Sequence, residues 1–585
     1  MLKSYTLLRG FWGVGQFLAF AFFLAPSAFA LPNCHAILPS GGSGAVDGSS
    51  WTAACNGVTQ SVSKCDPHAT SGSTELVRGD IYYFGGGTYT AGAPAIYMQT
   101  PDSGTLTITL YPATIAEHGQ DSAVCANSGT LAAGWSNSMA VDGGAGQVVL
   151  PKDNTTGLAA WHFATDYWII DGAPYIVTDT SATWGHVQSH SCTGNQCGFK
   201  MDATNALSPS GTWGINYATG VHNITVRAVE AAFNGLTAAQ ANQQATAFRM
   251  AGTSYTNINV SHCHLHDSPD TYVQYSSITF SVTYTWFERS FAYASTQHGE
   301  AFAGKGCTNC IIAFNDFQDI TGTGMVVDLN TGTGNTDNLQ IYSNLFRFSS
   351  GSSLPGSGNG FIACINSNTC TNWKIYNNVF SNVKPTTSTF NGISFGSAAS
   401  GSSFTAQNNI FFNNGDVSHQ LCAGCTGTFN SNYYTQNTTT PVGETGEQSD
   451  SATPFTNWTA DNYHLTTDTT AWAPLSSPYN VDTDGVTRTS SRGTFQFAGG
   501  TVVALGTALI PSLHCAAAVN TTATGLLSTD VVIVSFNAAP SGAYLTGLTI
   551  LPPDVAAGSF NIRVCNPTAG SLTPPAATLN WRVVH

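Results

Sequence analysis

NLQIYSNLF at residues 338–346 and NWKIYNNVF at residues 372–380 are two copies of one pattern. NCIIAFNDF at 309–317 and SFTAQNNIF at 403–411 repeat it, and weaker copies begin at Ile224, Ile258 and Ile278. From Ile224 to Phe404 there are six steps over 180 residues, a mean of 30 residues per copy. A period of this length is typical of solenoids, in which each repeat is one coil stacked on the next.

The spacing inside each copy predicts a strand, a corner and a second strand. Two apolar residues two positions apart point to the same side of a strand, and the three-residue step to Asn breaks that alternation. Asn tolerates the left-handed backbone of such a corner, and stacked amides can hydrogen-bond to one another. Cys263 occupies the Asn position of its coil, so we expect it to be buried and unpaired. The expected column is Asn315, Asn344, Asn378 and Asn409, with Cys263 beneath them.

The rest of the chain fits an all-β fold. Short β-branched and aromatic runs alternate with Gly, Asn, Ser and Thr, and no long helical pattern occurs. The repeats, together with GAVDGSSW at 44–51, GDIYYFGGGTYT at 79–90 and DTDGVTR at 482–488, resemble secreted right-handed parallel β-helix proteins of the pectate-lyase-like type. The resemblance implies a right-handed parallel β-helix solenoid with an N-terminal cap over residues 31–498. Strand patterns at 531–536 and 560–564 predict a small β-sandwich-like module over residues 499–585.

Residues 1–30 have the features of a signal peptide. Lys3 and Arg9 precede an apolar run, and Ala28-Phe29-Ala30 matches a small-residue cleavage site. An uncleaved anchor is the alternative. No later segment predicts a membrane span, so we expect a secreted, periplasmic or cell-surface protein.

The cysteines agree with export. Of fifteen, several form close pairs that predict disulfides in an exported chain: Cys192/Cys197, Cys307/Cys310, Cys364/Cys370 and Cys422/Cys425. Cys515 and Cys565 both lie in the C-terminal segment. A zinc site made by the two C-x-x-C pairs is disfavoured because they lie more than a hundred residues apart.

Charge is scarce and acidic. Without Lys3 and Arg9 the balance is 15 − 32 = −17. Nucleic acid is therefore excluded as a partner, because phosphate binding needs a basic surface. An acidic sugar is disfavoured unless a bound cation bridges the charges. The Ser-, Thr- and Asn-rich surface suits neutral glycans or a passive wall.

Runs of ionisable residues are few, and the richest is TQHGEAFAGKGC at 296–307. His298, Glu300 and Lys305 in it resemble a motif of polysaccharide lyase family six, in which acidic residues bind calcium and a lysine removes a proton. The resemblance implies Glu300 as a calcium ligand, here with Asp270, and Lys305 as the base. His298 stands where that family has an acidic residue.

Two reactions and one purely structural alternative follow from these residues. β-Elimination would use Lys305 as base, with His298 as a second acid–base group and Arg249 binding the acidic sugar or the developing charge. Hydrolysis would use Glu300 with Asp328 or Asp270. The alternative is a Glu300–Lys305 ion pair on a solvated face. Lys200, Arg249 and residues 298–305 are expected to line one long face.

His262, His264 and His266 flank the corner at Cys263, so their rings need not converge on a metal; exposed corner residues lining a groove are expected instead. The sequence thus predicts a secreted carbohydrate-active β-helix protein acting on an extracellular polysaccharide, by β-elimination or hydrolysis. The alternative is a non-catalytic, adhesive or structural glycan-binding solenoid. The oligomeric state is not indicated.

Overall fold

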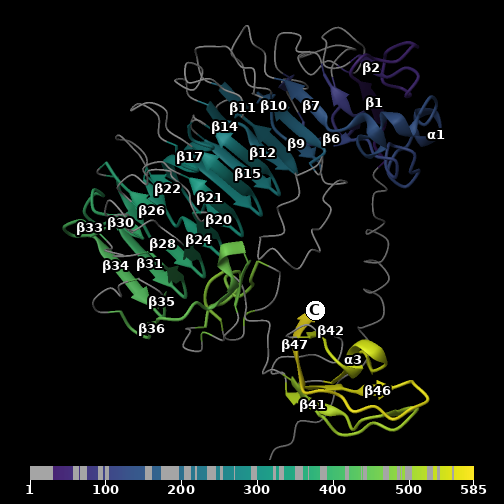
Figure 1. Ribbon diagram of the computed structural model, residues 1–585. Coiled ribbons are helices and arrows are strands. Elements are labelled where there is room, and N and C mark those ends of the chain that lie inside the picture. Colours follow the sequence, from purple (N-terminus) through teal and green to yellow (C-terminus); the bar gives the residue numbers. More distant parts are fainter. Residues whose placement is uncertain are drawn as a thin grey trace, which may run out of the picture.

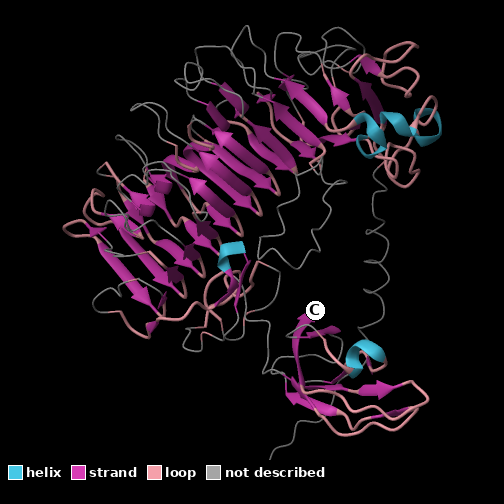
Figure 2. Ribbon diagram, in the orientation of Figure 1, coloured by secondary structure: helices cyan, strands magenta, loops and turns pink. Residues whose placement is uncertain are grey.

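The computed structural model describes most of the chain (Figures 1 and 2). Outside the described residues lie the signal segment up to residue 29 and the predicted boundary at 498/499. The full set of residues that are not described is 1–29, 57–64, 66–75, 90–95, 99–103, 152–160, 173–196, 203–211, 218–219, 234–244, 251–253, 269, 291–298, 321–323, 329–334, 349–359, 367, 382–391, 415–419, 436–437, 439–443, 461, 466–468, 470–473, 484–487, 489–490, 495–502, 523–530, 537–539, 557–558 and 585.

Parallel strands from successive coils stack into three long sheets, and the predicted right-handed parallel β-helix is confirmed (Figure 1). Sheet I contains β1 (Cys34–Leu38), β3 (Ile81–Phe84), β6 (Ile108–Pro112), β9 (Trp168–Asp171), β12 (His222–Arg227), β15 (Tyr255–Ser261), β20 (Ile311–Ala313), β24 (Gln340–Tyr342), β28 (Trp373–Tyr376), β31 (Ser403–Gln407) and β34 (Thr426–Asn430). Sheet II contains β4 (Gly87–Thr88), β7 (Val148–Pro151), β10 (Phe199–Asp202), β13 (Val229–Ala232), β16 (His264–Ser268), β18 (Trp286–Ser290), β21 (Asp316–Ile320), β25 (Leu345–Arg347), β29 (Val379–Ser381), β32 (Ile410–Phe412), β35 (Tyr433–Thr435) and β36 (Gln448–Asp450).

Sheet III contains β5 (Ile96–Met98), β8 (Trp161–Phe163), β11 (Thr212–Tyr217), β14 (Ala245–Met250), β19 (Phe302–Cys307), β22 (Gly324–Asp328), β26 (Gly360–Cys364), β30 (Ile393–Phe395) and β33 (Gln420–Leu421). The long strand β17 (Val273–Thr283) belongs to two sheets. Its first half pairs with β14 and β19 of sheet III, and its second half pairs with β15 and β20 of sheet I. Two short parallel pairings flank the sheets. In one, β2 (Cys55–Asn56) pairs with β1, and in the other β23 (Thr336–Asp337) pairs with β27 (Cys370–Thr371).

The inner side of sheet II carries a ladder of stacked aromatic rings, one per coil. Phe317 stacks on Phe346 at 4.5 Å and Phe380 on Phe411 at 4.8 Å, with nearly parallel ring planes. These separations match the strand spacing of about 4.8 Å, because each ring sits directly above its register partner. The aromatic that ends each sequence copy therefore faces inward, as predicted. The complete ladder is Phe287, Phe317, Phe346, Phe380, Phe411 and Tyr434.

The asparagine column is also confirmed, as a one-way hydrogen-bonded ladder. In each step the backbone N–H and the side-chain amide of one Asn donate to Oδ1 of the Asn in the next coil. For Asn344 and Asn378 both bonds measure 3.0 Å. The ladder runs from Asn315 through Asn409 to Asn432, where Glu444 Oε1 accepts the last two donors. Below it, Thr285 N donates to Asn315 Oδ1 and Cys263 is fully buried.

Two details of the predicted register are wrong. The left-handed residue at the corner is not the ladder Asn but the residue before it: Phe314, Ser343, Asn377 or Asn408. The ladder Asn thus has a negative φ, and its side-chain amide forms hydrogen bonds with neighbouring coils. The copy expected to begin at Ile278 begins at Phe280, because Phe280 pairs with Ile258 and Val282 with Ile312.

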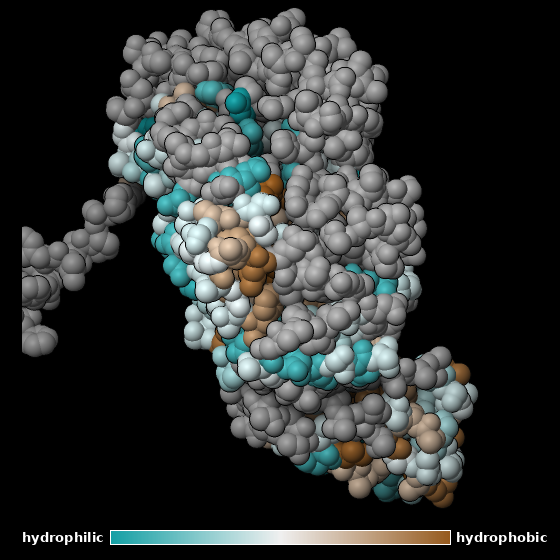
Figure 3. All heavy atoms as spheres, turned by 90° about the vertical axis from the view of Figure 1, so that its left-hand side faces the viewer, coloured by the Kyte–Doolittle hydropathy of each residue, from teal (hydrophilic) through white to brown (hydrophobic). Residues whose placement is uncertain are grey.

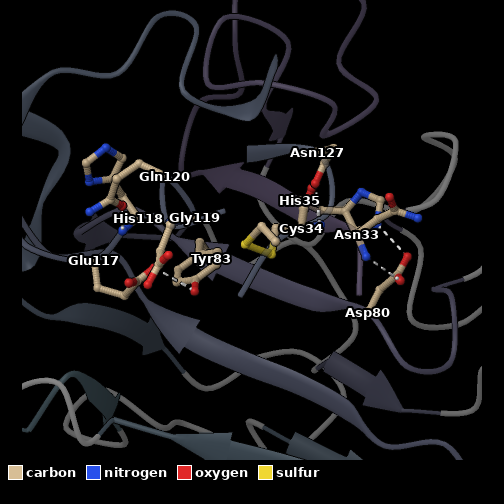
Figure 4. The surroundings of a disulfide bond; sticks show 12 residues. Asn33, Cys34, His35, Asp80, Tyr83, Glu117, His118, Gly119, Gln120 and Asn127 are labelled. Atoms are coloured by element: carbon tan, nitrogen blue, oxygen red, sulfur yellow. Dashed lines mark hydrogen bonds and ion pairs between the residues drawn. A yellow bond between two sulfur atoms is a disulfide. The ribbon is translucent and has the colours of Figure 1, made fainter. Parts of the chain in front are cut away.

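The first coil is closed by a cap that contains helix α1 (Ser128–Leu131) and short turns at Asn137–Met139 and Val141–Ala145. The disulfide Cys34–Cys125 lies at its centre, and Figure 4 shows a polar pair on each side of it. On one side His35 Nε2 lies 2.9 Å from Asp80 Oδ2, and on the other the Tyr83 hydroxyl donates to Glu117 at 2.8 Å. The cap therefore ties residues far apart in sequence to the first strand.

After the last coil the chain returns along the outer wall. The hairpin of β37 (Phe455–Asn457) and β38 (Asn462–Leu465), joined through a turn at Trp458–Ala460, packs on apolar residues of the outer side of sheet II, among them Leu345, Val379 and Ile410. Further on, Tyr479 donates to Gln340 at 2.7 Å and Thr494 to the Asn344 carbonyl at 2.6 Å. The returning segment thus covers the later coils.

The C-terminal strands are antiparallel and enclose a second hydrophobic core around Phe560, Ile562 and Leu579. They form three small sheets, drawn yellow and pale green in Figure 1. Their elements are β39 (Val503–Leu505), β40 (His514–Cys515), β41 (Val519–Thr522), β42 (Val531–Phe536), α3 (Ala543–Thr546), β43 (Thr549–Ile550), β44 (Asp554–Ala556), β45 (Ser559–Ile562), β46 (Val564–Asn566) and β47 (Ala577–Val584).

Most of the predicted disulfides are present, and one is not. Cys364–Cys370, Cys422–Cys425 and Cys515–Cys565 are bonded, and Cys55–Cys65 is bonded near the cap. Cys197 is disulfide-bonded, whereas its predicted partner Cys192 lies outside the described residues. The predicted Cys307–Cys310 bond is wrong, because both are buried free thiols, like Cys263. This number of disulfides indicates maturation in an oxidising compartment.

No helix among the described residues is long and apolar enough to cross a membrane.

Replacing Asn378 by alanine tests the ladder. The substitution leaves both donors of Asn344 without an acceptor in the core, and each buried unsatisfied group costs about 1–3 kcal/mol. We expect the free energy of unfolding to fall by roughly 3 kcal/mol, measured by urea denaturation. Asn259→Ala is the matched control, because its amide makes only an exposed bond to Asn257 and should change stability by less than about 0.5 kcal/mol. Equal effects of the two variants would contradict the ladder's role.

Thiol labelling tests the cysteine assignment. Burial raises the pKa of the Cys263 thiol to about 12, and burial also raises that of Cys307, so neither should react while the protein is folded. After unfolding without reductant, mass mapping should find label on Cys263, Cys307 and Cys310. Label on Cys263 alone would show that Cys307 and Cys310 are bonded after all.

Candidate functional site

The sequence-predicted residues do not lie on one face. Arg249 lies on β14 of sheet III, where its register partners are Asn216 and Gln274. Lys305 lies in the same sheet, on β19, paired with Ser276 of β17. Lys200 lies on β10 of sheet II, so the prediction that it lines the same face is wrong. Burial lowers the pKa of the Arg249 guanidinium below its ordinary value.

Glu300 and Asp270 lie just before β19 and β17, at the corner between sheets II and III. Glu300 is fully buried, and Thr271 Oγ1 donates to its Oε2 at 3.4 Å. Asp270 is also buried, and its backbone N–H donates to Ser268. His298 lies outside the described residues, and the side chain of Lys305 is not described. Within the described ranges no group of three or more His, Cys, Asp or Glu is arranged to hold a metal, so the calcium expectation stays a prediction.

Asp328 does not form an outward carboxylate pair with Glu300. It is on the same side of β22 as Val326, which belongs to the main core, and it is fully buried. Thr336 and Asn368 both donate to its carboxylate. The prediction of Asp328 as a hydrolytic carboxylate is therefore wrong, because the strand alternation turns it inward.

The described residues instead bring a dense ionic network together on the outer side of sheet II, over β10, β13, β16 and β18. Inward positions of these strands are apolar, such as Leu265 and Phe287, so the alternate residues point outward. Because the strands stack in register, outward side chains of successive coils meet. We call this set the sheet II cluster: Lys200, Glu230, His264, His266, Asp267, Glu288 and Arg289.

Glu230 is the hub of the first half of the sheet II cluster. Lys200 Nζ donates to its Oε1 at 2.8 Å, and Gln147 donates to its Oε2 at 2.8 Å. His266 Nε2 lies 3.2 Å from Glu230 Oε1, and His266 Nδ1 lies 2.8 Å from Asp267 Oδ2. The imidazole is thus held between two carboxylates from adjacent coils.

Arg289 and Glu288 make the second half. Arg289 Nε and Nη2 donate to the two oxygens of Asp267, at 2.7 and 3.1 Å, and its Nη1 donates to Glu288. Glu288 also accepts from His264 Nε2 at 2.9 Å. The His264 ring lies flat against Trp286, with centroids 4.0 Å apart, and 4.4 Å from the His266 ring. Every carboxylate of the cluster therefore has at least one cationic or imidazole partner.

These contacts fix the ionisation of the cluster. Burial opposes ionisation of Glu230 and Asp267, yet hydrogen bonds from His266 to both, from Lys200 to Glu230 and from Arg289 to Asp267 lower the pKa of each to about 2. Burial likewise opposes protonation of His266, but the two carboxylates raise its pKa above the ordinary value of 6.5. Burial lowers the pKa of His264 far below that value. The pKa values of these two stacked imidazoles are therefore shifted in opposite directions.

The arrangement supplies the groups needed for acid–base chemistry on an external substrate. His266 and Glu288 are register partners on adjacent strands, so a proton donor and a carboxylate face the same side of the sheet. Because adjacent strands are about 4.8 Å apart, an imidazole and a carboxylate on neighbouring strands can both reach one substrate group. Desolvating this many charges on a sheet surface is costly unless they are paired, and strongly shifted pKa values cluster at functional sites.

The sequence singles out Lys200 and the three histidines, but it does not indicate that they belong to one cluster. The prediction that His264 and His266 are exposed is wrong, because both are buried and the His264 ring stacks on Trp286. The register between coils is what the sequence does not show. Glu230 lies 34 residues before His264, and the two become neighbours because β13 and β16 pair in register. His262, at the corner, stacks on Tyr284 instead of joining the cluster.

The surroundings of the cluster differ along sheet II. Towards the later coils the outward residues become apolar and are covered by the β37–β38 hairpin. At the boundary Arg347 and Asp316 form a fully buried bidentate pair. Figure 3 shows hydrophilic residues and smaller hydrophobic groups interleaved on one side of the molecule, in keeping with the low charge of the chain.

Comparison with known proteins gives structural likeness without a sequence match. No family model matches the chain, and no curated protein matches it. Among solved structures it is similar to the Dettilon tailspike protein, with 12% identity over 86% of this chain and 88% of that chain and a TM-score of 0.33. It is also similar to a GH136 lacto-N-biosidase from Eubacterium ramulus, with 8% identity over 72% and 67% and a TM-score of 0.36. A third is pectate lyase Pel9A, with 12% identity over 80% and 97% and a TM-score of 0.32.

The pH dependence of stability tests the ionisation of the cluster. Glu230 has a folded pKa of about 2 against an ordinary value of 4.5, so its stabilisation is present above pH 4.5 and is lost as pH falls towards 2. That shift corresponds to about 3 kcal/mol. His266 has a raised pKa, so its contribution is present below pH 6.5 and is lost as pH rises through the folded value. Glu230→Gln should flatten the acid limb of urea-denaturation midpoints against pH, and an unchanged limb would contradict the assignment.

Proposed function

We propose that this protein is exported and cleaves glycosidic bonds of an extracellular polysaccharide by hydrolysis at the sheet II cluster. The observation that carries the proposal is that His266, held between two carboxylates, is the register partner of Glu288 on the adjacent strand of one outer face. The disulfides are consistent with export.

The chemistry assigns one role to each group. His266 gives up its Nε2 contact with Glu230 when substrate binds and donates that proton to the glycosidic oxygen, while the bond from that oxygen to the anomeric carbon breaks. Glu288 accepts a proton from the water that attacks the same carbon, so the reaction consumes one water and restores both groups after proton exchange. Glu230 and Asp267 are positioning residues, because they orient His266 and keep it protonated.

Turnover by variants tests these roles. A polysaccharide panel is scored for new reducing ends and for absorbance at 235 nm, which separates hydrolysis from elimination. On any substrate found, His266→Gln and Glu288→Gln should lower kcat by about 10²–10⁴-fold, the contribution of a general acid or base. Activity should fall as pH rises through the raised pKa of His266. Glu230→Gln should move that alkaline limit to lower pH, a change that a merely structural role would not produce.

Arg227→Gln is the control, because Arg227 pairs with Asp171 on sheet I, away from the cluster. Full activity in both His266→Gln and Glu288→Gln would show that the sheet II cluster is not the active site. Absence of cleavage across the panel, with binding retained, would favour the non-catalytic glycan-binding solenoid.

A second candidate, β-elimination on sheet III, is favoured by one observation. Arg249, whose guanidinium is desolvated, lies in the same sheet as Lys305, two strands away through β17. In this proposal Lys305 removes the C5 proton of an acidic sugar while the bond from C4 to the glycosidic oxygen breaks, His298 protonates that leaving oxygen, and Arg249 binds the carboxylate. Glu300 and Asp270 would hold a calcium ion that neutralises the same carboxylate. Lys305→Ala should then abolish the 235 nm product, and EDTA should do the same. Elimination that survives Lys305→Ala would refute this candidate.

A further inference from the structure

Arg289 is unusual for its place in the coil. It occupies the left-handed corner position at the end of β18, with φ of 53°. Glycine, asparagine and aspartate adopt this conformation most readily, and a bulky residue there is strained by about 1–2 kcal/mol. The equivalent positions one coil before and one coil after hold Asp267 and Asp319. A large cationic side chain has thus been placed where a small residue would fit the backbone better.

The contacts of Arg289 leave part of its guanidinium available. A guanidinium has five N–H donors. Nε and one N–H of Nη2 are taken by Asp267, and one N–H of Nη1 is taken by Glu288. One N–H on each of the two Nη nitrogens therefore has no acceptor among the residues that the structure describes. The side chain is 44% exposed, so the guanidinium is partly open to solvent while two carboxylates hold it in place.

The charge around Arg289 decides what those donors can bind. Three cationic side chains, Lys200, His266 and Arg289, stand with four carboxylates, because Asp319 adds its charge to those of Glu230, Asp267 and Glu288. The local balance is 3 − 4 = −1, in a chain that is acidic as a whole. An anionic ligand would meet net repulsion there, whereas sugar hydroxyls are neutral acceptors and also donors to the carboxylates.

We propose that Arg289 is a specificity-determining residue that recognises a pair of hydroxyl groups on a neutral polysaccharide. The inference rests on the proposed function, since it names the substrate class of the same site. It excludes uronates and sulfated glycans from the sheet II cluster. Arg289 acts here as a rigid two-donor group whose charge is already neutralised, with its strained backbone held by the Asp267 and Glu288 contacts.

Binding measurements test the proposal with defined probes. Isothermal titration uses dextran, galactan and mannan as neutral probes, and polygalacturonate and dextran sulfate as acidic ones. At least one neutral probe should bind, with a Kd that changes less than about twofold between 50 and 500 mM NaCl, because no counterions are released. Arg289→Lys keeps the charge but loses the paired donors, so it should weaken that binding about tenfold.

Arg227→Lys is the matched control, because Arg227 is 41% exposed and also pairs with an aspartate, and it should bind as the unmodified protein does. Circular dichroism and melting temperature establish that each variant is folded. If Arg289→Lys fails to fold, the salt dependence of the unmodified protein decides. Binding of the acidic probes alone, binding of none of the neutral probes, or an unaffected Arg289→Lys would each overturn the inference. Cleavage of an acidic substrate at this cluster would overturn the inference about Arg289 and leave the proposed hydrolysis intact. Binding of a neutral probe without any cleavage would contradict the proposed hydrolysis and leave the inference about Arg289 intact.

Discussion

The in-register stacking of parallel strands is the constraint on which the rest of this structure depends. Register is held from inside by the asparagine ladder, in which every amide both accepts and donates, so a slip of one residue would break two bonds per coil. The one-way direction of these bonds explains why the ladder ends on a carboxylate. Glu444 supplies acceptors that no further coil provides, and the Tyr434 hydroxyl donates to its other oxygen.

The same register makes the functional surface. Inside sheet II it produces a stack of phenylalanines, and outside it brings side chains from four coils into one ionic network. A carboxylate on one coil and a histidine on the next become partners without being near in sequence. The cost of desolvating these groups is offset by their mutual pairing, which raises the pKa of His266, while burial lowers that of His264, whose ring centroid lies 4.4 Å from that of His266.

The returning chain divides sheet II into two parts. Over the later coils the outer wall is apolar, and the β37–β38 hairpin packs against it. The charged coils lie before that region. Arg289 marks the difference most clearly, because the corner position that holds aspartate one coil before and one coil after holds a cation there. The proposed recognition of hydroxyls, and not of charge, agrees with the acidic and sparsely charged composition of the chain.

The sequence by itself determined the fold, because the copies at 309–317, 338–346, 372–380 and 403–411 encode strand alternation and the corner Asn locally. It also predicted the inward aromatics and the buried Cys263. The site was decided only by the tertiary structure. Coil lengths vary, so the sequence does not show that Lys200, Glu230 and His266 lie on neighbouring strands within contact of one another. Likewise the alternation that turns Asp328 inward depends on where its strand begins. A local pattern fixes which side of a strand a residue takes, but contacts between coils depend on the summed length of every loop between them.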